Sequence, residues 1–219
     1  ENRNFASIDG TSKMSTYLKF GEIHPRTILI ELNDTKDHDT FRKEICWREF
    51  YAEVLATAPE SETKSLDQKW ELMGWDQEKD FAERLKKWQE GKTGFPIVDA
   101  GMRQLKQTGW MHNRVRMIVA SFLVKDLHIH WRHGADWFMK HLLDGDIASN
   151  SHGWQWTAGC GTDASPYYRI FNPMMQAEKF DPNADYVRKW IPELRHLKGI
   201  SAHTPWDQVD GYAHGYPER

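Results

Sequence analysis

The feature that most constrains the fold is a helical spacing of apolar residues, which continues along most of the chain. After Thr40 such residues recur three or four positions apart until Pro59, which places them on one face of a helix. Residues 95–127 contain two further helical patterns, interrupted at Thr108 and Gly109. Val-rich segments of alternating polarity, which would predict strands, are missing. We therefore predict an all-α fold.

The first thirty residues predict two shorter helices. Thr11 or Ser12 can cap a helix that runs to Gly21, because a side-chain oxygen there accepts a hydrogen bond from a free backbone N–H. Pro25 suits the first turn of the next helix. The hydroxyls and Lys13 at the first helix start also suit a phosphate, which the positive end of a helix dipole favours. An ordinary helix cap uses the same residues.

The 219 residues include 11 tryptophans and carry a net charge of only -3. This charge excludes a globally basic protein, so a surface for nucleic acid has to be local, and residues 100–125 carry several bases and no acid. The longest apolar run, Met117 to Val124, is too short to span a membrane. Cys46 and Cys160 stand alone, which is typical of a reducing compartment. We expect a soluble, cytoplasmic protein that binds no membrane.

Two motifs have ordinary interpretations. Residues 159–164 match a loose dinucleotide-binding fingerprint, but they do not follow a buried strand, so we interpret them as a turn. His128, His130 and His133 suggest a metal site, yet their spacing spreads the rings over different helix faces and no cysteine joins them. We predict no metal.

Two clusters of residues at helical spacing are poor core material. The first comprises Glu44, Trp47 and Arg48, and the second comprises Trp110, Asn113, Arg116 and Met117. Such side chains can stack on a base, hydrogen-bond its edge and hold a nearby phosphate. Asp144, Asp146 and Asn150 concentrate further polar groups beside Trp154 and Trp156. They suit the wall of a site for a flat heterocycle, although a loop with Asx turns would use the same residues.

The chain resembles the flavin-binding helical domain of the photolyase/cryptochrome family, and within it the bacterial class I cyclobutane pyrimidine dimer DNA photolyases. The resemblance extends from Arg3 to about Leu194. It rests on long motifs: Gly10-Thr-Ser-Lys-Met-Ser15, Trp47-Arg-Glu-Phe-Tyr51, the segment Trp88 to Ala100, the segment Thr108 to Met117, Asp144-Gly-Asp146, Gly153-Trp-Gln-Trp156 and Arg169-Ile-Phe-Asn-Pro173.

The resemblance implies FAD as the cofactor, active as FADH⁻. Its pyrophosphate would be held by Thr11, Ser12, Lys13, Met14 and Ser15. The other cofactor-binding residues would be Phe41, Trp110, Asn113, Arg116, Asp144, Gly145, Asp146, Asn150 and Trp154. Arg116 paired with Asp144 would lie near the flavin N5, Asn150 would face N5, and Asp146 would accept from the pyrimidine part of the ring.

The resemblance also implies damaged DNA as the partner, with a pyrimidine dimer flipped out of the duplex. Trp47 and Trp156 would wedge the sides of the dimer, and Glu44 would hydrogen-bond its carbonyls. Asn113 and Met117 would complete the contact. The backbone phosphates would be met by Arg3, Arg48 and Arg114.

The implied reaction is light-driven electron transfer from FADH⁻ to the dimer, followed by return of the electron. Glu44, Asn113 and Asn150 would be catalytic in an electrostatic sense. Reduction of the resting flavin would use Trp154, then Trp131, then a surface indole. We assign this last position to Trp75, with Trp70 as the alternative.

We interpret residues 1–219 as a single helical FAD-binding and catalytic domain, cut from a longer protein that also has an N-terminal α/β antenna domain and a final helix. An antenna chromophore would bind only the full-length protein, and we expect a monomer. Two alternatives remain: a cryptochrome-like photoreceptor that uses the flavin without repair, and a cofactor-free helical DNA-binding module. A (6-4) photolyase would usually have histidines at the positions of Asn113 and Met117, so the sequence disfavours this third class.

Overall fold

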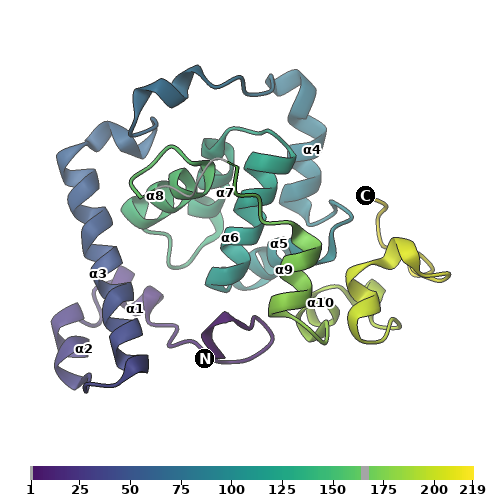
Figure 1. Cartoon of the computed structure of the whole chain (residues 1–219), viewed down its shortest axis with the longest axis horizontal. Coiled ribbons are helices and arrows are strands. Elements are labelled where there is room, and N and C mark those ends of the chain that lie inside the picture. Colours follow the sequence, from purple (N-terminus) through teal and green to yellow (C-terminus); the bar gives the residue numbers. More distant parts are fainter. Residues whose placement is uncertain (1, 164–167) are drawn as a thin grey trace.

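The computed structural model describes residues 2–163 and 168–219, and within these ranges every regular element is helical (Figure 1). The α-helices are α1 (Ser15–Lys19), α2 (Pro25–Glu31), α3 (Lys36–Thr57), α4 (Glu78–Glu90), α5 (Pro96–Thr108), α6 (Asn113–Ser121), α7 (Trp131–His141), α8 (Ile147–Ala158), α9 (Pro173–Phe180) and α10 (Asp185–Trp190). Single turns of other helix types are η1 (Asn2–Asn4), η2 (Pro59–Glu62), η3 (Gln68–Leu72), η4 (Phe122–Asp126), η5 (Pro192–Leu194), η6 (Gly199–His203) and η7 (Pro205–Asp207). The all-α prediction is confirmed.

The hydrophobic core lies where α5, α6, α7 and α8 meet, with α4 and α10 packed on α5 (Figure 1). Trp88, Met111 and Trp131 are among its fully buried side chains. The predicted break between two helices is confirmed, because α5 ends at Thr108 and Gly109 follows in the left-handed conformation with φ of 67°. Glycine adopts this conformation without steric cost.

Helix α3 stands at one side of the molecule, with α1 and α2 at its lower end, and it packs against α8 (Figure 1). Ile45 is its one fully buried residue. The predicted apolar stripe of α3, which begins at Phe41, is therefore only partly covered. The helix leaves a long accessible face on which Glu44 and Trp47 lie.

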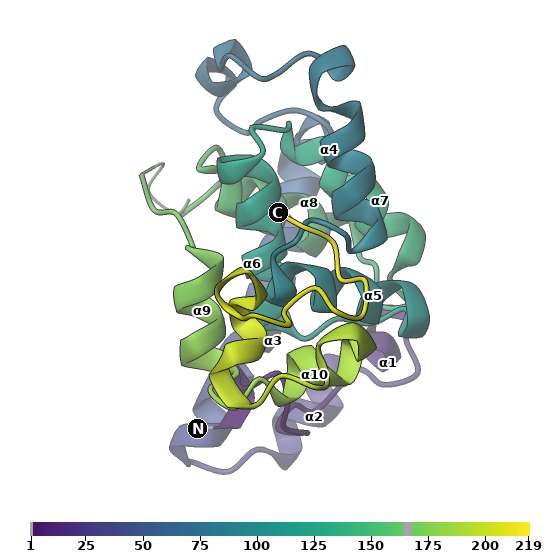
Figure 2. The same ribbon diagram turned by 90° about the vertical axis from the view of Figure 1, so that its right-hand side faces the viewer.

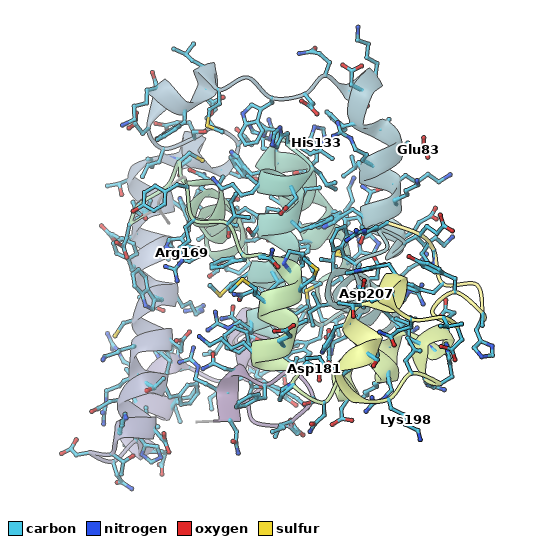
Figure 3. All side chains as sticks on the ribbon, turned by 45° about the vertical axis from the view of Figure 1, so that its right-hand side comes forward. Glu83, His133, Arg169, Asp181, Lys198 and Asp207 are labelled. Atoms are coloured by element: carbon cyan, nitrogen blue, oxygen red, sulfur yellow. The ribbon has the colours of Figure 1, made fainter. Side chains whose placement is uncertain are left out.

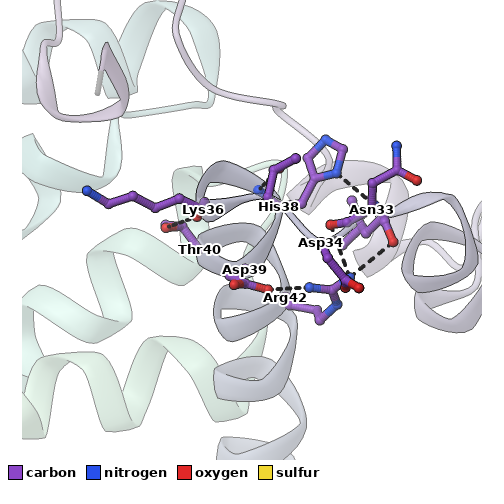
Figure 4. A network of polar contacts seen from close by, with 9 residues as sticks. Asn33, Asp34, Lys36, His38, Asp39, Thr40 and Arg42 are labelled. Carbon is purple, nitrogen blue, oxygen red and sulfur yellow. Dashed lines mark hydrogen bonds and ion pairs between the residues drawn. The ribbon is translucent and has the colours of Figure 1, made fainter.

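Helix α3 begins earlier than the apolar spacing after Thr40 predicts. Helix α3 begins at Lys36, with Thr35 as its cap, and Thr40 lies inside the helix. The earlier start is held by a polar network at the α2–α3 junction (Figure 4). Arg42 donates to the Leu32 carbonyl at 3.0 Å, and Asn33 N donates to His38 Nδ1 at 2.8 Å. A local polar network thus outweighed the weak apolar content of the first turn of α3.

The segment after α10 packs back onto α5 and α9, as Figure 2 shows in yellow. Tyr216 reaches the start of α5, where its hydroxyl donates to Asp99 at 2.6 Å. Figure 3 places Asp181 at the end of α9 and Lys198 and Asp207 on this returning segment. Across the described residues, no helix is both long and apolar enough to cross a membrane.

Candidate functional site

Three helices that the fold brings together carry eleven of the predicted site residues, including both lesion-wall indoles. Glu44, Trp47 and Arg48 lie on α3, and Asn113, Arg116 and Met117 lie on α6. Asn150, Trp154 and Trp156 lie on α8. Helix α8 packs against both α3 and α6, so it connects the two clusters that the spacing of the sequence had defined separately.

The most strongly held group of the site is the guanidinium of Arg116. It donates to both carboxylate oxygens of Asp144, at 3.0 and 2.8 Å, and its Nε donates to the Met111 carbonyl at 2.8 Å. The Asp144 side chain is only 2% exposed. A fork-like pair of this kind fixes the plane of the guanidinium as well as its position. Gly145, which follows Asp144, is also buried.

Asp146 and Asn150, at the start of α8, each use one polar side-chain atom in a hydrogen bond within the protein and keep one oxygen free. Asp146 caps the helix, because its Oδ1 accepts from Ser149 N at 2.9 Å. Asn150 Nδ2 donates to the Ala135 carbonyl at 3.0 Å. This bond fixes the orientation of the amide. Asn150 Oδ1 and Asp146 Oδ2 have no partner among the described residues, so both can accept from a ligand.

Trp154 is buried at 3% exposure and packs edge-on against Phe138 and Trp88, with ring centroids 5.0 and 6.1 Å away. Its six-membered ring occupies the space above Gly134, where any Cβ would overlap it. Gly134 lies one helical turn after Trp131 in α7. Gly134 was not among the predicted site residues. Because it lacks a Cβ, Trp154 can pack directly on α7, the helix that begins at Trp131.

His130 connects Trp131 with Trp75. Its ring centroid lies 5.5 Å from that of Trp131 and 4.9 Å from that of Trp75. Trp70 lies under Lys69, with the ammonium 5.4 Å from the ring centroid, and in the described part of the chain no ring contact joins it to Trp131. The geometry therefore supports Trp75 over Trp70 as the outer indole. Burial lowers the pKa of His130, so its ring is neutral near pH 7.

The loop from Thr11 to Ser15 differs from its prediction. Helix α1 begins at Ser15, its cap position is Met14, and no side chain caps it. Ser12 Oγ accepts from Met14 N at 3.4 Å, and Lys13 adopts the left-handed region with φ of 53°. A turn that precedes the helix has replaced the predicted cap, because the backbone at Lys13 is not helical.

Lys13 is tied to the rest of this region. Its ammonium lies 2.8 Å from Asp9 and 5.9 Å from the centroid of the Trp110 ring. The loop therefore faces Trp110, the residue that precedes α6 by three positions. Phe41, the remaining predicted cofactor residue, is half-buried on α3.

The three arginines predicted to meet phosphates already have protein partners. Arg3 lies 2.7 Å from Glu44, and Arg48 lies 2.5 Å from Glu49. Arg114 donates to Asn4 Oδ1 at 2.8 Å. Its guanidinium also stacks on Phe180, 4.4 Å from the ring centroid. Burial, followed by the nearby charges of Arg3 and Arg169, lowers the pKa of Arg114.

Aromatic rings surround the exposed end of the site. Trp47 is 42% exposed and packs on Tyr51, at 5.7 Å between centroids, and on Phe50 at 5.5 Å. Trp156 packs on Phe171 at 6.4 Å. Tyr51 and His152, whose rings also stack, were missed as site residues. The position of Tyr51, four residues after Trp47, was the signal that could have identified it.

The histidines that suggested a metal have other contacts. His130 Nδ1 caps α7 by accepting from Arg132 N at 3.2 Å, and His133 packs edge-on against Phe81 at 5.0 Å. Over residues 2–163 and 168–219, no three His, Cys, Asp or Glu side chains gather as metal ligands. Gly159 ends α8 in the left-handed conformation, in agreement with the turn predicted for 159–164. Ala164 itself lies outside the described residues.

The fold and the site together define a helical domain that binds a cofactor. Residues 41–219 match the family model described as the FAD binding domain of DNA photolyase, and the chain belongs to this family. The cofactor of the family is FAD.

Characterised relatives cover the whole chain. Deoxyribodipyrimidine photo-lyases are 47% identical over 227 residues in Vibrio cholerae and 46% identical over 230 residues in Escherichia coli. These alignments cover 99% and 100% of this chain but 47% and 48% of the relatives. The chain therefore spans about half the length of the relatives it matches.

Solved structures give the same result. A class III photolyase from Agrobacterium tumefaciens has a TM-score of 0.91 at 45% identity, and a cryptochrome from Synechocystis has a TM-score of 0.89 at 35% identity. Each match covers 99% of this chain and 47% of the other.

The residues present fit FAD. The Arg116–Asp144 pair offers a fixed guanidinium, and Asn150 Oδ1 and Asp146 Oδ2 offer acceptors of the kind that flavin N–H groups need. The hydroxyls of Thr11, Ser12 and Ser15 lie in the loop that faces Trp110.

Proposed function

We propose that this chain is the catalytic domain of a light-driven DNA lyase that reverses cyclobutane pyrimidine dimers. The observation that carries the proposal is the joining of two features by α8. One is the pair of the half-buried Arg116 and the buried Asp144, together with the free amide oxygen of Asn150, which suits a flavin. The other is an exposed indole, Trp47, beside Glu44 on the accessible face of α3, which suits a base lying outside the duplex.

Reduced FAD, when bound, would supply one photoexcited electron to the dimer and take it back, so the reaction has no net oxidation. The residues of the chain would position the cofactor and stabilise its charge. The segment from Thr11 to Ser15, which includes Lys13, would hold the pyrophosphate. Asp146 and Asn150 would accept hydrogen bonds from the flavin. Asp144 would orient Arg116. Phe41, Trp110, Asn113, Gly145 and Trp154 would complete the cofactor site.

The proposed lesion contacts require a rearrangement at Glu44. An ionised carboxylate only accepts hydrogen bonds, so Glu44 can donate to a thymine carbonyl only when protonated. The Arg3 guanidinium now donates to one oxygen of this carboxylate at 2.7 Å. We therefore infer that Arg3 turns toward a backbone phosphate as the dimer enters. Glu44, released from this ion pair, would then take up a proton from solvent and donate it in a hydrogen bond to the lesion carbonyl. Asn113, exposed at the first position of α6, and Met117 would contact the dimer from the other side.

The test is a repair assay on the FAD-loaded protein, chemically reduced before illumination. An oligonucleotide with a single thymine dimer should regain thymine absorbance under blue light and not in darkness. Glu44→Gln should lower the yield per absorbed photon, while Lys198→Gln, on the distant returning segment, should not. Equal signals in light and darkness would disprove the lyase.

The second candidate is a photoreceptor without repair activity, favoured by the structural similarity to the Synechocystis cryptochrome. It predicts bound FAD and light-dependent spectral changes with no restored thymine. A colourless protein that binds DNA would instead support the cofactor-free module.

We also propose that residues 1–219 form one domain of a monomeric protein whose other half is an α/β antenna domain. The match to about half of each relative supports this organisation. Any antenna chromophore would then be bound outside these residues.

A further inference from the structure

Three stacked rings connect the exposed face of α3 to the interior of α8. Trp47 stacks on Tyr51 at 5.7 Å with an interplanar angle of 29°. Tyr51 stacks on His152 at 5.5 Å with an interplanar angle of 7°. The row therefore begins at a ring that is 42% exposed and ends at a side chain that is 1% exposed.

His152 is fixed at the buried end of this row. Its Nδ1 donates to the Ala148 carbonyl at 2.7 Å, and its Nε2 lies 3.0 Å from Ser61 Oγ. Ser61 is buried and is itself held, because Gln155 Nε2 donates to its carbonyl at 2.6 Å. Burial lowers the pKa of His152, which keeps the ring neutral near pH 7. A ring held at both nitrogens cannot shift without breaking a buried hydrogen bond.

The helical positions of these residues give the row a mechanical role. Trp47 and Tyr51 are four residues apart on α3, so they share a face, and so do His152 and Trp156 on α8. The contact between Tyr51 and His152 is therefore the spacer between the helix face that carries Trp47 and the helix face that carries Trp156. Trp156 is supported from its other side by Phe171.

We propose that His152 is a positioning residue which, through Tyr51, sets the width of the slot between Trp47 and Trp156 that receives the pyrimidine dimer. The inference rests on the proposed function, which makes these two indoles the walls of the lesion site. Only one face of Trp47 is needed for the row, and its other face stays available to the lesion. The row thus holds an exposed indole in place before binding, which reduces the ordering cost on association.

The width of the slot should affect the binding affinity for dimer-containing DNA. It should not affect the affinity for ordinary duplex DNA, whose bases stay stacked and whose contacts are to phosphates. The test measures dissociation constants of the FAD-loaded protein in darkness, for a dimer-containing duplex and for the undamaged duplex of the same sequence. His152→Ala should weaken binding of the dimer duplex about 3- to 10-fold, the size of an aromatic pair contribution. The affinity for the undamaged duplex should be unchanged.

His152→Phe retains the stack without the hydrogen bonds and should restore most of the dimer preference. Tyr51→Leu breaks the same stack from the α3 side and should reproduce the loss, which keeps the test decisive if His152→Ala does not fold. His196→Ala is the matched control, because His196 packs edge-on against His214, away from the site, and it should behave as the unaltered protein. Once the dimer is bound, the repair yield per photon should not change in any of these variants.

Trp47→Ala separates this inference from the proposed function. If it leaves the dimer preference unchanged, the lesion site is misplaced and the proposed function fails with it. If it abolishes the preference while His152→Ala and Tyr51→Leu retain it, the inference alone is overturned. An equal loss for damaged and undamaged duplexes in His152→Ala would also overturn it, because a general structural defect would then explain the result.

Discussion

His112 caps α6 through a ring nitrogen that must stay unprotonated. Its Nδ1 accepts from Arg114 N at 3.1 Å, and the side chain is 2% exposed. His24 and His130 cap α2 and α7 in the same way. A protonated imidazole has no lone pair to accept with, so acid removes such a cap. His112 is the buried member of the three, and it pays the largest penalty for gaining a proton.

We predict that His112 makes the protein sensitive to acid. Burial is the main cause that lowers its pKa from 6.5 to about 4, so between these values the unfolded chain binds a proton that the folded chain excludes. The free energy of unfolding should therefore be fully retained above pH 6.5 and should fall by ~3 kcal/mol as the pH drops below 4. His112→Asn retains a cap acceptor without a titrating ring and should reduce this pH dependence.

Urea unfolding at pH 7, 5.5 and 4 would measure the effect. The comparison is between the pH slopes of the two proteins, because the substitution also alters packing. His214→Asn, at an exposed histidine, should leave the slope unchanged. Identical slopes for His112→Asn and the unaltered protein would contradict the prediction.

Gly134 should tolerate no side chain. Its Cβ would overlap the Trp154 ring, so Gly134→Ala should cost about 1–3 kcal/mol, the usual penalty for overpacking, and should change the near-ultraviolet circular dichroism of Trp154. Gly153→Ala is the control, because its Cβ would meet no atom within 4 Å. Because Gly153 lies inside α8, Gly153→Ala should raise the free energy of unfolding by up to about 1 kcal/mol through helix propensity. Similar effects of both substitutions would disprove the packing role.

At the scale of elements, the spacing of apolar residues predicted α3, α5 and α6 correctly as helices, since periodicity is a local property. Their starts were less predictable. Helix α3 begins four residues before Thr40 because Arg42 satisfies carbonyls of the preceding loop, and this contact depends on how the chain folds back. The start of α1 shifted because the backbone at Lys13 is left-handed.

In the candidate site, too, local spacing predicted the groups of residues on one helix but not the contacts between helices. Glu44, Trp47 and Arg48 could be grouped from helical spacing, because one helix carries all three. The stacking of Tyr51 on His152 joins residues of α3 and α8 that are far apart in sequence, and no local pattern contains that information. The position of His130 between two tryptophans likewise depends on how the segment before α4 packs against α7.

The packing of that segment favours Trp75 over Trp70 as the outermost residue of the proposed electron relay. Trp75→Phe should slow photoreduction of the oxidised flavin several-fold, because a phenyl ring fills the space beside His130 but is far harder to oxidise than indole. Trp70→Phe should have little effect. Repair by chemically reduced protein should be preserved in both variants, and Trp131→Phe supplies the reference for a blocked relay. Slow photoreduction in Trp70→Phe with a normal rate in Trp75→Phe would reverse the assignment.

At the scale of the whole molecule, the returning C-terminal segment is closed by the hydrogen bond from Tyr216 to Asp99. Asp99 is fully buried and also accepts from Thr93 N at 2.7 Å and Gly94 N at 3.0 Å. Burial raises the pKa of this carboxyl, and the hydrogen bonds oppose the rise. The last residues of the described chain therefore complete the polar environment at the start of α5.

Removing the Tyr216 hydroxyl should destabilise the whole domain. Tyr216→Phe leaves the ring in place but removes one donor to a buried carboxylate, which should cost about 1–3 kcal/mol of unfolding free energy. Tyr212→Phe, at a half-buried tyrosine of the same segment, should change stability little. Chemical unfolding monitored by tryptophan fluorescence would measure both. A stability of Tyr216→Phe equal to that of the unaltered protein would show that the contact adds nothing.

The contact between Tyr216 and Asp99 also orders events during synthesis, because 117 positions separate the two residues. At the usual speed of a ribosome, Asp99 is synthesised roughly 6–23 s before its partner. The nascent chain must keep the start of α5 hydrated until then, since the carboxylate lacks its full set of donors. Final consolidation of the helices around α5 should therefore wait until Tyr216 has been synthesised and has folded back onto the start of α5.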